Sequence, residues 1–329
     1  MAENSKIEWT HHTFNPWIGC QKVGPGCDNC YAEEMMATRY GRVRWGPRAE
    51  RSRTGAANWM KPLKWDREAA AAGERRRVFC ASLADIFDSH SSISPAWRLS
   101  LWDLIRRTPN LDWMLLTKRP GNIAGMLPPD WNGGWPNVWL GCTVTNQAEA
   151  DRDISKLMTV PAAVRFLSIE PLLGPIDLTV AWHGENALSS ECWGDCAWCS
   201  EGHPPLHNCQ RGRQTETNWD KGRSGIDLVI VGGESGSNAR PMHPDWARDL
   251  RDQCKEEGVP FHFKQWGEWV SVSEAEGPGR HHKFPDGATV RRTGKVRAGR
   301  AFDGTTWDQM PALTDRQLRD LIVGERGSA

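Results

Sequence analysis

Three cysteines near the N-terminus, Cys20, Cys27 and Cys30, lie close enough in the sequence to share one loop and one metal centre. Three thiolates can bind three irons of a [4Fe–4S] cluster and leave the fourth iron open for a cofactor, just as a catalytic metal site keeps one position free for its substrate. The alternative is a zinc site in which His11, His12 or a distant residue supplies the fourth ligand.

A second group of cysteines lies within an irregular stretch, residues 181–225, that separates two predicted strands. Four local ligands close a coordination shell, which is typical of a structural zinc site in a segment with little hydrophobic core. We therefore predict a zinc knot here, with an auxiliary iron–sulfur cluster or unligated thiols as the alternatives. Its cysteines are Cys192, Cys196, Cys199 and Cys209.

Polar side chains that can bind ligands follow several short apolar runs of the sequence. Ligands of parallel α/β folds gather at the carboxyl ends of the strands, so this placement predicts a site at one edge of a sheet. The alternative for each carboxylate is a helix cap or a salt bridge. The residues in these positions are Asp85, Thr117, Lys118, Arg119, Thr143, Thr145, Asn146, Glu170, Glu234, Lys264 and Gln265.

The elements that must position these residues alternate between strands and helices. Apolar runs of strand length cover residues 78–83, 113–117, 138–144, 164–169, 228–231 and 260–263. Helices with N-terminal caps are predicted between some of them, over residues 95–107, 147–158 and 243–257. Apolar strands joined by helices imply an α/β fold with a parallel sheet, either an open doubly wound sheet or a barrel.

Composition indicates a soluble globular protein. The chain has 329 residues, 39% of them hydrophobic and 25% charged, with 41 Lys+Arg against 41 Asp+Glu. These values exclude a disordered tail, a collagen-like rod and a globally basic nucleic-acid coat. The sequence shows no signal peptide and no apolar stretch of membrane-spanning length, so we predict a cytoplasmic protein without membrane contact.

Two stretches are basic although the net charge is zero. Residues 39–77 contain 12 Lys/Arg and 4 Asp/Glu interleaved with tryptophans, and residues 280–300 contain 7 Lys/Arg and one acid. Basic residues with interspersed aromatic rings suit a single-stranded nucleic acid, through phosphate contacts and base stacking. Solvated loop charge is the alternative.

Motifs along almost the whole chain resemble the phage and bacterial family of three-Cys-motif, radical-SAM-like proteins, the phage Gp37/Gp68 type. SAM here is S-adenosyl-L-methionine. Besides the cysteine loop, the resemblance lies in residues 6–10 (KIEWT), 15–17 (NPW), 116–120 (LTKRP), 137–141 (NVWLG), 165–172 (RFLSIEPL), 229–236 (VIVGGESG), 239–242 (ARPM) and 263–267 (FKQWG).

The resemblance implies a partial (β/α) TIM-like barrel of the radical-SAM type with a Cys-rich insertion. It implies a [4Fe–4S] cluster on Cys20, Cys27 and Cys30, with SAM on the open iron. We expect residues 1–180 to form the N-terminal part of the barrel, residues 181–225 the insertion, and residues 226–329 the remaining barrel and a tail.

Roles within the expected site are assigned by location. Asp85 or Glu170 would bind the amino group of SAM, and Lys118 or Lys264 a substrate phosphate. Trp17 and Trp266 could shield a radical or stack on a base. The full set expected to bind the cofactor is Asp85, Thr117, Thr145, Asn146, Glu170 and Glu234.

The function predicted from these features is that of a radical-SAM-like iron–sulfur enzyme that modifies or repairs a nucleic acid or nucleotide. DNA or RNA is the expected partner, and a protein encoded nearby is a second candidate. The alternative is a zinc-stabilised nucleic-acid-binding or adaptor protein without catalysis.

Overall fold

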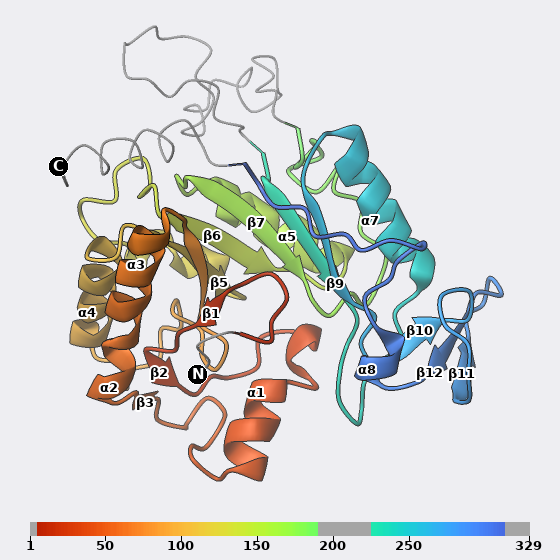
Figure 1. The fold of residues 1–329 in the computed structure, drawn as a ribbon, viewed down its shortest axis with the longest axis horizontal. Coiled ribbons are helices and arrows are strands. Elements are labelled where there is room, and N and C mark those ends of the chain that lie inside the picture. The colour runs from red at the N-terminus through yellow and green to blue at the C-terminus, as the bar shows by residue number, and fades with distance from the viewer. Residues whose placement is uncertain (1–4, 190–224, 313–329) are drawn as a thin grey trace, which may run out of the picture.

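The computed structural model describes residues 5–189 and 225–312, and their centre is a seven-stranded sheet with every neighbouring pair parallel (Figure 1). The strands stand side by side in chain order: β1 (His12–Thr13), β4 (Arg76–Cys80), β5 (Leu111–Thr117), β6 (Val138–Thr143), β7 (Val164–Ile169), β8 (Leu228–Gly232) and β9 (Phe261–Gln265). A doubly wound sheet reverses its strand order near the middle, and this sheet does not. The fold is therefore an open α/β half-barrel, as the sequence predicted.

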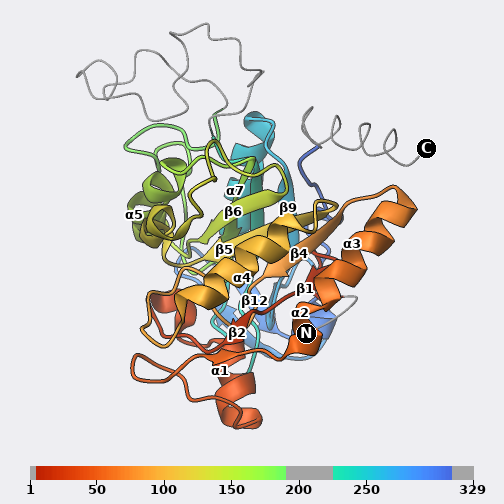
Figure 2. The same cartoon turned by 90° about the vertical axis from the view of Figure 1, so that its left-hand side faces the viewer.

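Helices lie in four of the connections between successive strands of the sheet and pack on its outer face (Figures 1 and 2). Their starts follow from local sequence, because Ser94, Asn146 and His243 each accept a backbone hydrogen bond as N-cap residues. The helices are α3 (Lys61–Ala72), α4 (Pro95–Arg106), α5 (Gln147–Met158) and α7 (Pro244–Glu256).

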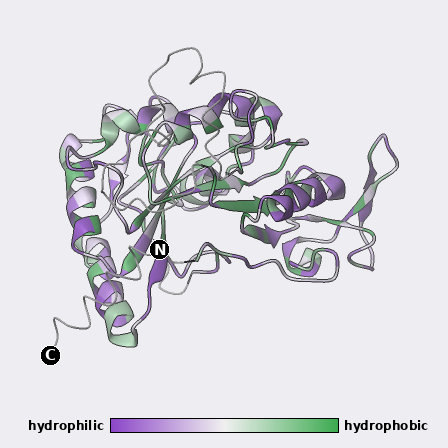
Figure 3. Ribbon diagram, turned by 90° about the horizontal axis from the view of Figure 1, so that it is seen from above, coloured by the Kyte–Doolittle hydropathy of each residue, from purple (hydrophilic) through white to green (hydrophobic). Residues whose placement is uncertain are grey.

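Each face of the sheet has its own hydrophobic core, because side chains alternate along the strands. On β5, Trp113 and Leu115 pack outward against the helices, whereas Met114 joins an inner cluster with Phe166. Trp9, from the N-terminal segment, fills the hollow of the half-barrel in that inner cluster. Figure 3 shows the hydrophobic residues concentrated on the central strands.

Smaller elements surround the carboxyl end of the sheet. A two-stranded ribbon flanks the cysteine loop in the chain: β2 (Trp17–Ile18) precedes it and β3 (Ser52–Arg53) follows it. A three-stranded antiparallel sheet follows β9, in the order β10 (Trp269–Ser271), β12 (Thr289–Arg292), β11 (Arg280–Lys283). The short helical elements are η1 (Pro25–Cys27), α1 (Tyr31–Glu33), η2 (Glu34–Arg39), α2 (Ala56–Trp59), η3 (Pro120–Asn122), η4 (Ala124–Met126) and α8 (Lys295–Ala298).

Several expectations from the sequence concern segments that contain regular elements or that lie outside the described residues. The basic residues 39–77 and 280–300 contain regular elements, α3 in the first and β11, β12 and α8 in the second. The cysteines of the expected zinc knot, residues 192–209, lie outside the described residues, and the division into three parts stays a prediction. Among the helices that the structure describes, none combines the length and apolar character needed to cross a membrane.

Candidate functional site

A cavity of about 460 Å³ lies at the carboxyl ends of the parallel strands. Its floor includes the apolar side chains of Trp9, Phe79 and Leu116, and its rim is polar. The three cysteines of the N-terminal loop line it together with residues at or just after the ends of six strands, β4 to β9. Of the residues predicted for the site, the cavity is lined by Cys20, Cys27, Cys30, Asp85, Thr117, Lys118, Glu170, Glu234 and Lys264.

The cysteine loop packs closely against the turn between β6 and α5. A side chain at Gly26 would place its Cβ 2.6 Å from Thr145 Cγ2, and one at Gly24 would meet Glu149. Cys27 ends the turn η1, and Cys30 is the N-cap of α1. The two glycines therefore let the loop lie close enough for its cysteines to face the cavity.

The three cysteines are free thiols, and burial favours the protonated form of Cys20 and Cys30. Burial, reinforced by nearby Asp85 and opposed by Arg119, raises the pKa of Cys20 to about 11. Burial also raises the pKa of Cys30. A nucleophilic cysteine needs a lowered pKa, so Cys20 and Cys30 are not poised for covalent catalysis. Three thiols at one cavity suit a soft metal centre that replaces their protons.

The spacing of the sulfurs distinguishes between metal centres. A tetrahedral zinc ion, about 2.3 Å from each thiolate, draws its ligand sulfurs to within about 4 Å of one another. In the described part of the chain, the three cysteines form no group, with or without a fourth ligand, in which all ligand atoms lie within 4.8 Å. An iron–sulfur cluster holds its cysteines further apart because irons and sulfides lie between them. The three sulfurs therefore do not have the spacing of a single zinc site in this structure, and three thiols at one cavity are the donor set that a cluster with one open iron needs.

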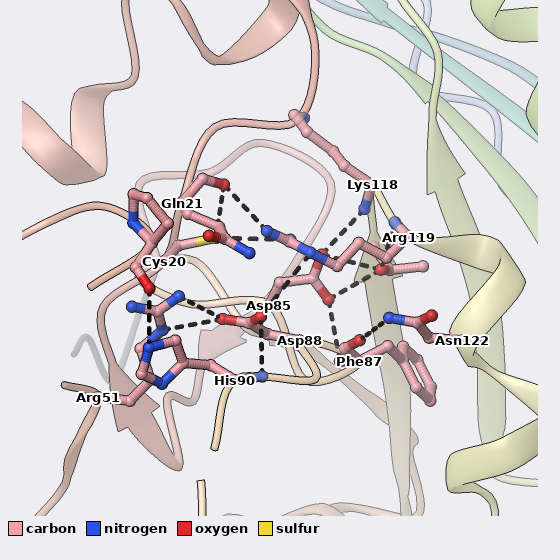
Figure 4. A network of polar contacts seen from close by, with 12 residues as sticks. Cys20, Gln21, Arg51, Asp85, Phe87, Asp88, His90, Lys118, Arg119 and Asn122 are labelled. Carbon is pink, nitrogen blue, oxygen red and sulfur yellow. Dashed lines mark hydrogen bonds and ion pairs between the residues drawn. The ribbon is translucent and has the colours of Figure 1, made fainter. Parts of the chain in front are cut away.

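Arg119 connects the Cys20 end of the loop to the ends of β4 and β5 (Figure 4). Its Nη1 lies 2.8 Å from Asp85 Oδ2 and donates to Cys20 Sγ at 3.6 Å, and its Nη2 donates to the Gln21 carbonyl at 3.0 Å. Both oxygens of Asp85 also accept from the Thr117 hydroxyl, at 2.8 and 2.9 Å. Asp85 and Thr117 are thus engaged with protein groups, and they position Arg119 and the loop.

Arg240 forms a second such connection from the end of β8. Its Nε and Nη2 donate to the two oxygens of Glu234 at 2.9 and 2.5 Å, and its Nη2 also donates to the Pro25 carbonyl at 2.9 Å. Asn29, between two of the cysteines, donates to Glu234 at 2.9 Å. Burial raises the pKa of Glu234, but the hydrogen bonds from Arg240 and Asn29 outweigh it and lower the pKa. Glu234 is therefore an ionised anchor of the loop.

Polar atoms without a protein partner face the cavity from its walls. Among the described residues, the hydroxyl of Thr143 and the side-chain carbonyl of Gln265 are buried without a hydrogen bond, although both side chains line the cavity. Glu170 pairs with Lys264 through one oxygen at 3.0 Å and leaves the other without a partner. Buried polar groups are costly unless they are satisfied, so these atoms mark where a ligand binds.

Lys118 is a cation of the rim whose ammonium group has no partner in the described part of the chain. Its backbone amide donates to Asp85 at 3.1 Å, but its ammonium group has no hydrogen-bond or ion-pair partner there. The side chain approaches the cysteine loop, because its Cε would lie 3.7 Å from a Cβ at Gly26. An unpaired ammonium beside buried thiols attracts an anionic ligand group.

Four predicted site residues do not line the cavity. Asn146 caps α5 and Thr145 hydrogen-bonds Glu149, so both serve the start of that helix. Trp17 and Trp266 are fully buried, and Trp266 donates to the Ala301 carbonyl at 2.7 Å. Neither indole ring has a free face for a base, because each packs in the outer core.

The sequence placed Arg119 among the strand-end residues of the expected site but did not show that Arg119 and Arg240 hold the loop. Arg119 and Arg240 stand in the motifs that carry the resemblance, yet pairing with carboxylates from distant strand ends is visible only in the fold. Asn29 and Asn15 were missed as well. The Asn15 side chain accepts from Leu83 N at 2.7 Å and donates to Ser82 at 3.0 Å, which joins the two chain segments that lead into the site.

Comparisons with known proteins give one family and a distant likeness in fold. No curated protein matches the chain significantly. Two solved structures are similar over 98% of this chain and 74% of their own, each with a TM-score of 0.40. They are a spore photoproduct lyase complexed with dinucleoside spore photoproduct, 10% identical, and a mutant spore photoproduct lyase, 12% identical. A family model matches residues 4–311, and the chain therefore belongs to the family described as "Protein of unknown function (DUF5131)".

Proposed function

We propose that the protein is a radical-SAM-type iron–sulfur enzyme that acts on a nucleic acid or a nucleotide. The observation that carries this proposal is the position of Cys20, Cys27 and Cys30. All three line the cavity at the carboxyl end of a parallel half-barrel, and no fourth histidine, cysteine or carboxylate of the described chain closes their coordination at zinc distances.

The cavity residues fit this cofactor by their chemistry. Cys20, Cys27 and Cys30 would ligate three irons and leave the fourth for SAM. The free oxygen of Glu170 would accept a hydrogen bond from the amino group of SAM, and the Thr143 hydroxyl and Gln265 carbonyl offer further polar contacts. When bound, the cluster supplies the electron that cleaves SAM reductively and yields a 5′-deoxyadenosyl radical for hydrogen abstraction.

The remaining residues of the site orient the loop and exclude water. Arg119 and Arg240 hold the two ends of the cysteine loop against the strand ends. Trp9 and Phe79, both buried, close the floor of the cavity. A dry floor protects a reactive intermediate from side reactions, so these apolar residues suit radical chemistry.

The charge of the rim supports an anionic substrate. Lys118 offers an ammonium group that has no partner among the described residues, and Lys264 is held nearby by Glu170. An ammonium group binds phosphate as a compact point charge. A nucleotide or a nucleic-acid strand supplies such a phosphate beside a hydrogen-bearing sugar or base.

Reductive SAM cleavage tests the proposal. Anaerobically reconstituted protein should release 5′-deoxyadenosine from SAM after reduction with dithionite, and Cys27→Ala should abolish this release. Cys254→Ala removes a buried cysteine of α7 away from the cavity and serves as the matched control, which should retain the activity. Zinc bound in place of iron, with no 5′-deoxyadenosine from the wild type, would leave only a zinc-stabilised nucleic-acid-binding protein.

A further inference from the structure

We infer that the substrate is a single-stranded nucleic acid that crosses the mouth of the cavity, bound on one side by an arginine segment, residues 39–48, and on the other by the basic face around β11 and α8. The inference rests on the proposed function for the chemistry inside the cavity. The docking surface itself is argued from charge, exposure and position.

The arginine segment is fixed beside the cysteine loop. The amide of Gly46 donates to the Cys20 carbonyl at 3.0 Å. Just after the segment, Arg51 forms an ion pair with Asp88 at 2.8 Å in which both side chains are fully buried. Trp45, within the segment, lines the cavity. Through Trp45 the segment therefore borders the cavity, and its exposed arginines lie next to that residue in the chain.

The charges of this segment have no acidic partners in the described protein. Arg39, Arg42, Arg44 and Arg48 are all exposed, and none of them makes an ion pair with a described residue. Other cations of the same basic stretch do: for example, Arg75 pairs with Asp112 at 2.8 Å. Clustered unpaired arginines repel one another, and a polyanion relieves that repulsion with release of its counterions.

An exposed aromatic ring lies among these arginines. Tyr40 is 52% exposed, and the guanidinium groups of Arg39 and Arg42 lie 5.7 and 5.6 Å from its ring centroid. Aromatic rings and guanidinium planes are the surfaces on which unpaired bases stack. The combination of phosphate-binding charge and a stacking ring favours a nucleic-acid strand over a simple polyanion.

The opposite side of the mouth is basic as well. Lys295, at the start of α8, lines the cavity at 4.0 Å from Glu8, and the neighbouring Val296 is 97% exposed. Arg280 and Lys283 on β11 are exposed and, within the described residues, have no acidic partner. Val290 on β12 is fully buried against the body of the protein, so the small sheet is anchored while its cations face solvent. Figure 1 shows this sheet and the α1–η2 region at the same end of the half-barrel.

The size of the cavity favours an unpaired strand. Small-molecule sites measure about 300–1,000 Å³, and a cavity of about 460 Å³ belongs to that class and is too small for a duplex. A base of a duplex would have to leave its stack at a cost of a few kcal/mol, whereas a base of a single strand is already accessible.

Fluorescence anisotropy with a labelled single-stranded oligonucleotide tests the inference. Arg42→Gln/Arg44→Gln should weaken binding about tenfold and lower the slope of log K against log salt by about 1.4, the value for two lost single-strand phosphate contacts. Tyr40→Ala should weaken binding of the oligonucleotide but not of heparin. Arg280→Gln/Lys283→Gln should act like the first pair. The matched control, Arg106→Gln/Arg107→Gln, lies before the start of β5 at the opposite end of the sheet and should bind like the wild type.

Several results would overturn the inference: equal binding by the Arg42/Arg44 and control variants, tighter binding of a duplex of the same length, or equal loss of heparin binding in Tyr40→Ala. Iron content and thermal unfolding of each variant show whether it is folded. Because the assay needs no cluster, the two proposals can fail separately. If the wild type binds no iron but binds the oligonucleotide, and the Arg42/Arg44 variant binds it more weakly, the docking surface is supported while the radical-SAM proposal fails.

Discussion

Arg119 and Arg240 act on the cysteine loop from opposite edges of the site. Each pairs with a carboxylate from a strand end, Asp85 or Glu234, and donates to a backbone carbonyl of the loop. Hydrogen bonds to cluster sulfurs and buried charges are among the factors that set the potential of an iron–sulfur cluster. The contact of Arg119 with Cys20 Sγ therefore gives this residue an influence on the proposed cofactor as well as on the loop.

Replacing Arg119 should destabilise the protein even without metal. Arg119→Gln leaves Asp85 buried without its ion-pair partner, and breaking a buried pair costs about 3–5 kcal/mol. Urea unfolding of the metal-free protein measures the loss. Arg107→Gln breaks an exposed pair with Asp103 and should cost at most about 1 kcal/mol. Equal stability of the two variants would contradict the anchoring role of Arg119.

His262 should make stability depend on pH between about 6.5 and 4. Burial, opposed by Asp308 and reinforced by Arg300, lowers the pKa of this β9 histidine from 6.5 to about 4. As the pH falls, the unfolded chain therefore binds a proton on this histidine before the folded protein does. The stabilising contribution of the neutral His262 is complete above pH 6.5 and is lost as the pH falls to about 4. Over this range the wild type should lose up to about 3 kcal/mol more than His262→Gln. Unfolding curves at several pH values measure this, with the exposed His282→Gln as a control that keeps the wild-type slope.

The position of the cysteine loop depends on its close packing against the start of α5. Gly26→Ala would place a methyl group 2.6 Å from Thr145 Cγ2, so the loop must shift and the cysteines with it. We expect iron content after reconstitution to fall by at least half. Gly125→Ala, at a glycine whose Cβ meets nothing within 4 Å, should bind iron normally. Full iron content in the Gly26 variant would show that the loop tolerates displacement.

Elements were predictable from the sequence where hydrophobic pattern and capping agreed. β7 and α5 have the predicted bounds, because β7 is a fully buried run and Asn146 caps α5. The small sheet was missed because all four residues of β11 are exposed and polar, so its sequence carries no alternation of buried and exposed side chains. α3 was missed because its charge suggested a loop, although Trp65 and Ala69 lie on one buried face.

At the scale of the whole molecule, the N-terminal segment closes the hollow that seven strands leave open. Trp9 is 1% exposed and packs on Phe79 and Phe166, with ring centroids 4.6 and 6.3 Å away. Trp9→Ala should lower the free energy of unfolding by about 3–5 kcal/mol, and Trp9→Phe by less. Leu99→Ala, at an exposed position of α4, is the control. A small effect in Trp9→Ala would show that the half-barrel is stable without its plug.

The half-barrel explains how much of the site the sequence could predict. Residues after strands were expected to meet at one edge, and Lys118, Glu170 and Lys264 do line one cavity. Which of them remain free for a ligand depends on partners far away in sequence, such as Arg119 for Asp85. Trp17 was misplaced because the sequence next to a cysteine loop does not show which way a ring points.

Metal content, measured by elemental analysis after anaerobic reconstitution with iron, sulfide and zinc together, decides between a cluster and a zinc site. We predict about four irons per chain on the N-terminal cysteines, lost in each of Cys20→Ala, Cys27→Ala and Cys30→Ala and retained in Cys254→Ala. A chain whose three cysteines take up one zinc ion and no iron would contradict it.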